Sequence, residues 1–371
     1  MKNKVVFLTG ATGLVGSYLL KMLIKANYKI YVLARRKGEK SPVDRVKNIL
    51  SFWDKDLFFD QEKVIVLDGD LTKVNFGIDK KYFDKLKEEL NEIIHCAALT
   101  SYKYQLKDFR TVNVLGTKKI LDFALQCKKL GEFKKVNHIS TAYICGNFTG
   151  PFEESDLDVG QKFNSSYEQS KFEAEKLIQE YRDEMGLWID IFRPCAVVGD
   201  SKDGKITSFQ FNFYRALHFW SLEIFDYFPG KGLFINLVPV DELAESIIMI
   251  DQKNSTKNMN FHTFCKDKID LEQITDAFCK LTNYKRPIVV TSEEFYAKSS
   301  CTSGQKKLAD SIFLPFNGRV QIVSSKTGNL LQDWGFNYSK INEESFFVLF
   351  RYFIDAHAQI NIAKTSSVKL P

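Results

Sequence analysis

A glycine-rich segment near the N-terminus restricts the fold of this chain more than any other feature of its sequence. Thr9-Gly-Ala-Thr-Gly-Leu-Val-Gly16 directly follows an apolar run over 4–8 and precedes apolar residues at helical spacing over 14–26. Glycines between a strand and a helix permit a tight turn and let a diphosphate approach backbone N–H groups, and the helix dipole favours that anion. The segment therefore predicts a dinucleotide-binding turn. Its expected contact residues are Gly10, Thr12, Gly13, Leu14, Val15 and Gly16.

Short apolar runs alternate with longer amphipathic stretches over the first 200 residues. The runs typical of strands cover 4–8, 29–34, 63–67, 92–96, 135–139 and 188–192. The helical patterns between them cover 14–26, 42–53, 109–129 and 167–184. Strands that alternate with helices predict the α/β class, here a doubly wound parallel Rossmann sheet. Its ligand is expected at the carboxyl ends of the strands.

After residue 200 the alternation becomes irregular, and 371 residues are enough for two lobes. We predict a nucleotide-binding Rossmann domain over 1–200, to which 236–265 return. Residues 201–235 and 266–371 are predicted to form a smaller, mixed, C-terminal substrate-binding lobe. The aromatic residues of 209–220 either line a lipid-like pocket or belong to the core of that lobe.

Charge and cysteine content exclude several classes of protein. The 52 basic and 46 acidic residues give a net charge of +6 without any basic block, so no nucleic-acid partner is expected. Seven cysteines without a Cys-x-x-Cys pair indicate neither a zinc site nor a disulfide scaffold, and His95 and His138 have no second ligand at metal spacing. We expect both histidines to be buried in the sheet and the chain to bind no metal. Because no apolar run is long enough for a signal peptide or a transmembrane helix, a cytoplasmic location is expected.

The end of the second predicted strand indicates which dinucleotide binds. An acid at this place bonds the ribose 2′-hydroxyl of NAD, whereas arginine accommodates the 2′-phosphate of NADP. The chain has Arg35 and Arg36 here, no acid before Glu39, and Arg45 on the next predicted helix. Guanidinium groups bind phosphate bidentately, so NADPH is the expected cofactor. A solvated basic loop is the alternative interpretation.

Two pairs of residues indicate acid–base chemistry at the same edge of the sheet. Tyr167 and Lys171 are four residues apart at the start of a predicted helix, so they share one face. A phenol has a pKa near ~10, and an adjacent cation lowers it, which makes the phenol a better proton donor at neutral pH. Ser140 and Thr141 follow the fifth predicted strand, where a hydroxyl can hold a carbonyl oxygen beside the tyrosine. Further along the same edge, Asp70 and Leu71 close the third strand, where an adenine would lie.

With these motifs in this order, residues 4–250 resemble the extended short-chain dehydrogenases/reductases. Within them the chain is most similar to the thioester reductase and fatty acyl-CoA reductase branch, whose NAD(P)-binding domain is of the male-sterility type. The motifs that carry the resemblance are Gly10-x-x-Gly13-x-x-Gly16, Gly69-Asp-Leu-Thr72, Ile94-His-Cys-Ala-Ala98, Asn113-Val-x-Gly-Thr117, His138-Ile-Ser-Thr-Ala-Tyr143, Tyr167-Glu-Gln-Ser-Lys171, Arg193-Pro-Cys-Ala-Val-Val-Gly199 and Val238-Pro-Val-Asp241.

The resemblance implies a role for each residue of the site. Tyr167 would protonate the substrate oxygen as hydride arrives, and Lys171 would bond the nicotinamide ribose and tune the tyrosine. Thr141 would bond the carbonyl, in preference to Ser140, and Asn113 would order the proton relay. The residues that would line the cofactor also include Asp70, Leu71, Ala97, Ala98, Pro194 and Val197. One departure is Cys145, which stands before Gly146 where the family usually has tyrosine.

The resemblance implies NADPH-dependent reduction of an acyl thioester, on coenzyme A or on an acyl or peptidyl carrier protein, to an aldehyde. A second reduction would give the alcohol. Three alternatives stay open: a sugar-nucleotide epimerase or dehydratase, a ketone or aldehyde reductase, and a non-catalytic NADP(H) sensor. Epimerases usually carry an acid after the second strand, dehydratases place Asp-Glu where this chain has Ala142-Tyr143, and sensors typically lose the tyrosine or the lysine.

Overall fold

Seven strands in the described part of the chain form one sheet in the order β12-β7-β5-β4-β1-β2-β3. All neighbours in this sheet pair in parallel. The strands are β1 (Val5–Thr9), β2 (Lys29–Ala34), β3 (Val64–Asp68), β4 (Glu92–His95), β5 (Lys135–Ile139), β7 (Ile189–Pro194) and β12 (Asn260–Thr263). The order reverses between β1 and β4, and such a switch point opens a crevice at the carboxyl ends of the strands. The predicted doubly wound Rossmann sheet is confirmed.

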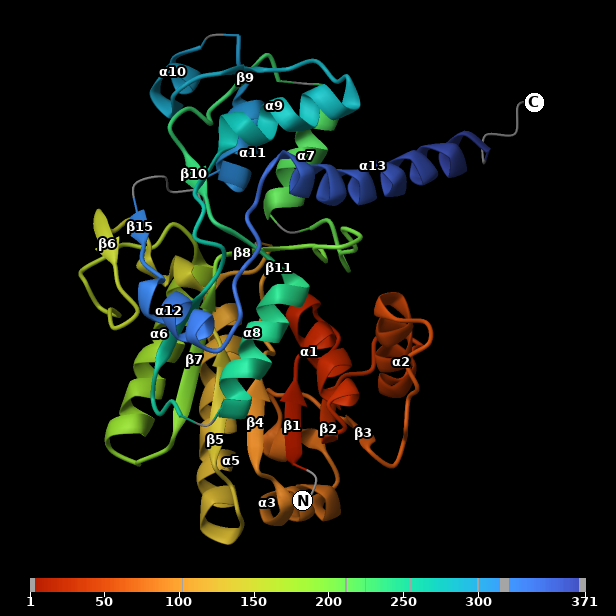
Figure 1. Ribbon diagram of the computed structural model, residues 1–371, viewed down its shortest axis with the longest axis vertical. Helices are drawn as coiled ribbons and strands as arrows, with labels where there is room; N and C mark the ends of the chain where they lie inside the picture. The colour runs from red at the N-terminus through yellow and green to blue at the C-terminus, as the bar shows by residue number, and fades with distance from the viewer. Residues whose placement is uncertain are drawn as a thin grey trace. The chain divides into compact units, whose positions relative to one another are not determined.

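Helices cover both faces of this sheet (Figure 1). On one face α3 (Lys80–Glu89), α5 (Leu115–Leu130) and α6 (Ser166–Asp183) pack side by side. On the other face lie α1 (Leu14–Lys25) and most of α8 (Val240–Lys253), with α2 (Pro42–Trp53) against α1. Local sequence explains where the helices begin, because the side chains of Ser41 and Ser165 cap α2 and α6 by accepting backbone N–H bonds.

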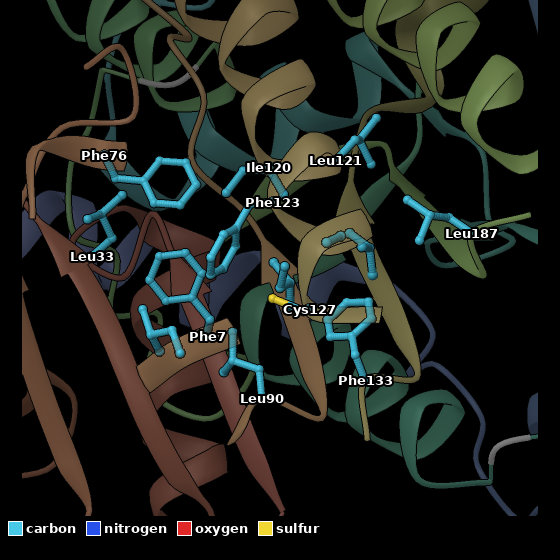
Figure 2. Packing of buried hydrophobic residues seen from close by; sticks show 14 of the residues in the cluster. Phe7, Leu33, Phe76, Leu90, Ile120, Leu121, Phe123, Cys127, Phe133 and Leu187 are labelled. Carbon is cyan, nitrogen blue, oxygen red and sulfur yellow. The ribbon is translucent and has the colours of Figure 1, made fainter. Parts of the chain in front are cut away.

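Aromatic side chains fill the space between the sheet and α3 and α5 (Figure 2). Phe7 of β1 lies with its ring centroid 6.0 Å from that of Phe123 on α5, in an edge-on arrangement. Phe76 contacts Phe123 at 5.3 Å, and Phe83 of α3 contacts it at 4.9 Å. All four are buried, and each buried phenylalanine contributes roughly 1.5–3 kcal/mol. This core fixes the strand ends that carry the candidate site.

The structure, a computed structural model, describes residues 4–101, 103–210, 212–223, 225–253, 255–298, 300–313 and 320–366. The chain forms two compact units. The first consists of Met1–Cys195, Leu243–Thr263 and Val320–Asn337, and the second of Ala196–Glu242, Phe264–Arg319 and Tyr338–Pro371. The division drawn from sequence assigned all of 266–371 to the second lobe, whereas 320–337 group with the sheet.

Short elements complete the first unit around the sheet. They are η1 (Val74–Gly77), α4 (Leu106–Phe109), the π-helical turn η2 (Arg110–Val114), η3 (Ala142–Cys145), β6 (Gly150–Phe152), β15 (Val320–Ile322) and α12 (Ser325–Asp333). Strands β6 and β15 pair in parallel, and α12 packs against β12. The late segment 320–337 therefore contacts both the edge of the sheet and the strand that follows η3.

The second unit combines short strand pairs with helices. The pairs are β8 (Ala196–Val198) with β11 (Leu237–Pro239), β9 (Tyr227–Phe228) with β14 (Ile288–Val289), and β10 (Phe234–Ile235) with β13 (Ile269–Asp270). The helices are α7 (Asn212–Ser221), α9 (Leu271–Thr282), α10 (Ser292–Ala297), α11 (Ser303–Phe313) and α13 (Glu343–Ser366). Of the predicted aromatic cluster, Phe213, Tyr214 and Trp220 are buried among other aromatic rings of this unit, and Phe211 lies outside the described residues.

Within the described ranges, no helix has both the length and the apolar character needed to cross a membrane. The same residues contain no group of three or more histidine, cysteine or acidic side chains arranged to hold a metal ion.

Candidate active site

The glycine-rich turn after β1 has no room for side chains. Gly10 has φ +77°, and a Cβ on it would lie 2.6 Å from the backbone nitrogen of Ala97. A Cβ on Gly16 would lie 2.3 Å from the carbonyl oxygen of Gly10, to which Gly13 donates its N–H at 2.9 Å. The backbone of the turn is thereby held open at the N-terminal end of α1. This is the arrangement that a diphosphate requires.

A chain of buried hydrogen bonds joins the ends of β1 and β4 to the π-helical turn. The N–H of Ala97 donates to Oγ1 of Thr9, which lies 2.8 Å from Nδ1 of His95. On its other side, Nε2 of His95 lies 3.1 Å from Oγ1 of Thr117, which donates to the carbonyl of Asn113 at 2.6 Å. The directions of these bonds place the His95 proton on Nε2. Burial keeps the ring neutral and lowers the pKa of His95 to about 3.

Asn113 connects this chain to the helix that carries the predicted tyrosine and lysine. Its Oδ1 accepts the N–H of Leu99 at 2.7 Å, and its Nδ2 donates to the carbonyl of Leu99 at 3.1 Å. Nδ2 also donates to Oγ of Ser170 on α6 at 2.9 Å. A π-helical turn is rare and occurs frequently at functional sites. Here it brings the amide between β4 and α6.

Tyr167 and Lys171 lie on the first two turns of α6. Lys171 is buried, and its Nζ donates to the carbonyl of Ile139 at 2.8 Å and lies 3.1 Å from Nε2 of His138. Burial lowers the pKa of Lys171 to about 8, although Glu175 counteracts the effect. Tyr167 is half-buried beside Phe109. The structure thus brings Lys171 to the carboxyl end of β5, with Tyr167 one helical turn before it on α6.

The two neighbouring hydroxyls after β5 differ in what they bind. Ser140 donates to the carboxylate of Glu175, one turn after Lys171 on α6. Glu175 in turn accepts two bonds from the fully buried Arg193 of β7, at 2.6 and 3.1 Å. Thr141 caps η3, with its Oγ1 3.4 Å from the carbonyl of Pro194. The Ser140 hydroxyl is committed to Glu175, which supports Thr141 as the group that faces a substrate.

Basic side chains cluster beside the glycine-rich turn at the end of β2. Arg45 donates from Nη2 to Oγ1 of Thr12 at 2.9 Å and from Nη1 to the carbonyl of Arg35. Burial and the charge of Arg35 lower the pKa of Arg45. The Arg35 side chain is two-thirds exposed, with Nη1 3.4 Å from Asp70. The side chain of Arg36 is also exposed, and its Nε lies 3.8 Å from the carboxylate of Asp68 at the end of β3. The charges of Arg35 and Arg45 therefore lie near enough to affect one another, and Asp70 is the carboxylate that pairs with Arg35.

The remaining predicted contact residues lie around the same strand ends. Hydrogen bonds from Thr72 and the charge of Arg35 outweigh burial and lower the pKa of Asp70. Leu71 is buried, and a Cβ on Gly116 would lie 2.7 Å from it. Ala98 follows β4, and Leu14 and Val15 open α1. Val197 belongs to the second unit, where it pairs with Val238 in β8 and β11.

Sequence reasoning missed three buried groups near the site. Glu175 and Arg193 form the ion pair behind Ser140, and a polar cavity of about 310 Å³ borders both. Their spacing carried a signal, because Glu175 follows Lys171 by four residues and Arg193 precedes Pro194. Glu168, beside Tyr167, is buried, and burial raises its pKa to about 7.

Comparison with known proteins shows the family of this chain. Residues 8–247 match the NAD-binding family described as male sterility protein. The chain is 30% identical to L-2-aminoadipate reductase of Schizosaccharomyces pombe over 264 residues, which cover 66% of this chain and 18% of that protein. It is 35% identical to fatty acyl-CoA reductase 1 of Pongo abelii over 154 residues, which cover 39% of this chain and 29% of that protein.

Solved structures share the fold. The terminal R domain from the myxalamid PKS-NRPS biosynthetic pathway has a TM-score of 0.80 and 22% identity, covering 95% of this chain and 91% of that domain. The chain spans less than a third of the length of the curated relatives named above.

Proposed function

Because the chain belongs to the male sterility protein family of the extended short-chain dehydrogenases/reductases, we propose that it is an NADPH-dependent reductase of acyl thioesters. The observation that carries the proposal is the position of Lys171, one helical turn after Tyr167, whose buried Nζ is held at the end of β5 by the carbonyl of Ile139. Family relatives named as acyl-CoA and aminoadipate reductases support the substrate class. Acyl groups on coenzyme A or on a carrier protein are the proposed substrates, and the carrier protein is a proposed partner.

The glycine-rich turn fits a dinucleotide, since a Cβ at Gly10 would clash with the backbone of Cys96 and Ala97 and a Cβ at Gly16 with the backbone of Gly10, so only glycine permits this tight turn at the start of α1. Bound NADPH supplies the hydride that converts the thioester carbonyl to a hemithioacetal, which breaks down to an aldehyde and a thiol. Tyr167 donates its phenolic proton to the substrate oxygen, and Thr141 donates a hydrogen bond to the same oxygen. The Lys171 ammonium lowers the pKa of the phenol and binds the nicotinamide ribose.

Asn113 holds α6 in place through Ser170. The residues Asp70, Leu71, Ala97, Ala98 and Pro194 of the first unit are the proposed cofactor lining. We assign the cofactor to the first unit and propose the second unit as the substrate lobe, in a cytoplasmic protein. Preference for NADPH over NADH is supported by the neighbouring positive charges of Arg35 and Arg45, since guanidinium groups bind phosphate bidentately. Arg36 is a third candidate contact.

The test of the reaction offers purified protein a panel of acyl-CoA and carrier-bound acyl thioesters. NADPH oxidation should be faster than NADH oxidation, and aldehyde should appear. Tyr167→Phe should lose at least a hundredfold in kcat and keep its affinity for NADPH, because only the proton donor is removed. Full activity in this variant would overturn the assigned chemistry. Turnover of a free ketone or aldehyde without any thioester turnover would favour the simple carbonyl reductase.

The test of cofactor choice uses two single variants. Arg35→Ala and Arg45→Ala should each weaken NADPH binding by about tenfold or more while leaving NADH binding almost unchanged, since only NADPH carries the phosphate. Lys37→Ala, in the same loop, is the matched control. Equal weakening of both cofactors would refute the phosphate assignment.

A further inference from the structure

The buried histidine of β5 contacts the predicted catalytic lysine directly. Nε2 of His138 lies 3.1 Å from Nζ of Lys171, and both side chains are almost fully buried. Among the described residues, the ammonium has one other acceptor, the carbonyl of Ile139 at 2.8 Å. An imidazole is therefore one of the two groups that hold this charge away from water.

We propose that His138 is a positioning residue of the reaction, whose Nε2 accepts a hydrogen bond from Lys171 and keeps that lysine charged and aimed at the end of β5. The inference deepens the proposed function and rests on it for the role of Lys171. Among the described residues, the hydrogen bond of the His138 side chain goes to Lys171 and not to the phosphate turn or to the proposed substrate hydroxyls. His138 thus acts through the lysine.

The two buried histidines of the sheet, His95 and His138, differ in how many of their ring nitrogens have hydrogen-bond partners. Both nitrogens of His95 are used by Thr9 and Thr117, so that ring ties strands and a helix together. His138 has no such frame, since its Nδ1 is buried without a hydrogen-bond partner among the described residues. In the described part of the chain, the one hydrogen bond of the His138 side chain is the bond to Lys171. Its polarity serves the lysine and no other described group.

Protonation of the two side chains is linked by this contact. While Lys171 is an ammonium, it donates to Nε2, and the imidazole must stay neutral with its proton on Nδ1. Burial and the nearby positive charge keep His138 neutral by lowering its pKa well below the usual range. The groups that act on the pair are Glu175 and Arg182 of α6, His95 of β4 and Cys96 after it. Glu175 favours the ammonium, whereas burial opposes it.

Two amide substitutions at His138 test whether the hydrogen bond to Lys171 matters, independently of the shape of the imidazole ring. Glutamine places its Oε1 at the position of Nε2, so His138→Gln keeps an acceptor for Lys171. Asparagine places its amide at the position of Nδ1, so His138→Asn removes that acceptor while the site stays polar. His138→Leu is a second variant without an acceptor and replaces His138→Asn if the latter melts far below the wild type.

The first measurement follows the titration of Lys171 by NMR in protein labelled with 13C-lysine, with the signal assigned by its absence in Lys171→Met. In the wild type we expect a pKa of about 8. His138→Asn should lower the pKa of Lys171 by about one pH unit, a tenfold change in acidity, because the ammonium loses an acceptor. His138→Gln should restore most of the difference. Equal values in the wild type and both variants would overturn the proposal, whether or not the protein reduces thioesters.

The second measurement is the pH profile of kcat/KM for NADPH. The basic limb should move to lower pH in His138→Asn by the same amount as the lysine pKa, and return in His138→Gln. A uniform loss of activity at every pH in both variants would show a merely structural role and contradict the proposal. A wild type without thioester-dependent NADPH oxidation would instead reject the proposed function, and the titration of Lys171 would still decide the bond to His138.

Discussion

The buried ion pair of Arg193 and Glu175, which joins β7 to α6, can be tested for its contribution to stability. Arg193 is fully buried and Glu175 is 1% exposed, and they are joined by bonds of 2.6 and 3.1 Å. Glu175→Gln keeps an acceptor for Ser140 but leaves the guanidinium without its counter-ion. Breaking a buried pair in this way costs about 3–5 kcal/mol, a large part of the ~5–15 kcal/mol that holds a typical domain folded.

A double-mutant cycle shows how much of this loss in the free energy of unfolding comes from the interaction between Arg193 and Glu175. Arg193→Met leaves the opposite charge buried and should cost a similar amount, whereas the double variant buries neither charge. We expect the double variant to be more stable than the sum of the single losses predicts, by about 2 kcal/mol or more. Lys176→Met is the matched control on the same helix, because the partner of Lys176, Asp158, is exposed, and we expect almost no change in stability.

The assay is urea unfolding followed by tryptophan fluorescence and far-UV circular dichroism. Because the chain has two units, the transitions of the two probes are fitted separately if they do not coincide. Additive losses in the cycle would refute the reasoning, and so would a Lys176→Met variant as unstable as Glu175→Gln.

Three more predictions follow from single positions. Gly10→Ala should abolish NADPH binding in a fluorescence titration and lower the melting temperature, because its Cβ would clash with the backbone of Ala97. Gly38→Ala, also at positive φ but in open space, should bind NADPH normally. Normal NADPH binding by Gly10→Ala would contradict this tight packing of the turn. Burial raises the pKa of Glu168 from 4.5 to about 7, so the wild type loses stability as the pH rises from about 4.5 to about 7. Glu168→Gln should therefore gain up to about 3 kcal/mol in the free energy of unfolding, relative to the wild type, between pH 5 and 8. Parallel curves of stability against pH for the two proteins would refute this. Asn113→Ala removes the bond to Ser170, and we expect a loss of about 2 kcal/mol in urea unfolding with at least tenfold slower NADPH oxidation; a native kcat would contradict the role.

Hydrophobic pattern predicted the sheet because its strands are buried on both faces and read as continuous apolar runs. The predicted ranges 29–34 and 135–139 match β2 and β5, and 42–53 matches α2, which has proline at its first position and a serine cap. Helix α3 was missed because Lys80–Glu89 is highly charged and buries only Phe83 and Leu86. The pairing of β6 with β15 was missed because the partners lie about 170 residues apart, and no local pattern encodes such a contact.

The candidate site was predictable where chemistry depends on spacing along one element. Tyr167 and Lys171 share a helical face, and the glycines of the turn recur every third residue from Gly10 to Gly16. The choice between Ser140 and Thr141 depends on Glu175, which reaches Ser140 across the fold. The π-helical turn depends on a shift in backbone hydrogen bonding that residue types alone do not specify.

The first unit is assembled from three stretches of chain, and the last ends at residue 337. Edge strand β12 pairs with β7, and the backbone and side chain of Thr327 in α12 bind the carboxylate of Glu154. During synthesis on the ribosome, the nucleotide-binding fold therefore lacks strand β12 until residue 263 has emerged, and lacks the bonds between Thr327 and Glu154 until α12 has emerged. A fragment that ends near residue 195 lacks β12, so the edge of β7 would be free to pair with other chains. We therefore expect this fragment to aggregate when it is expressed alone.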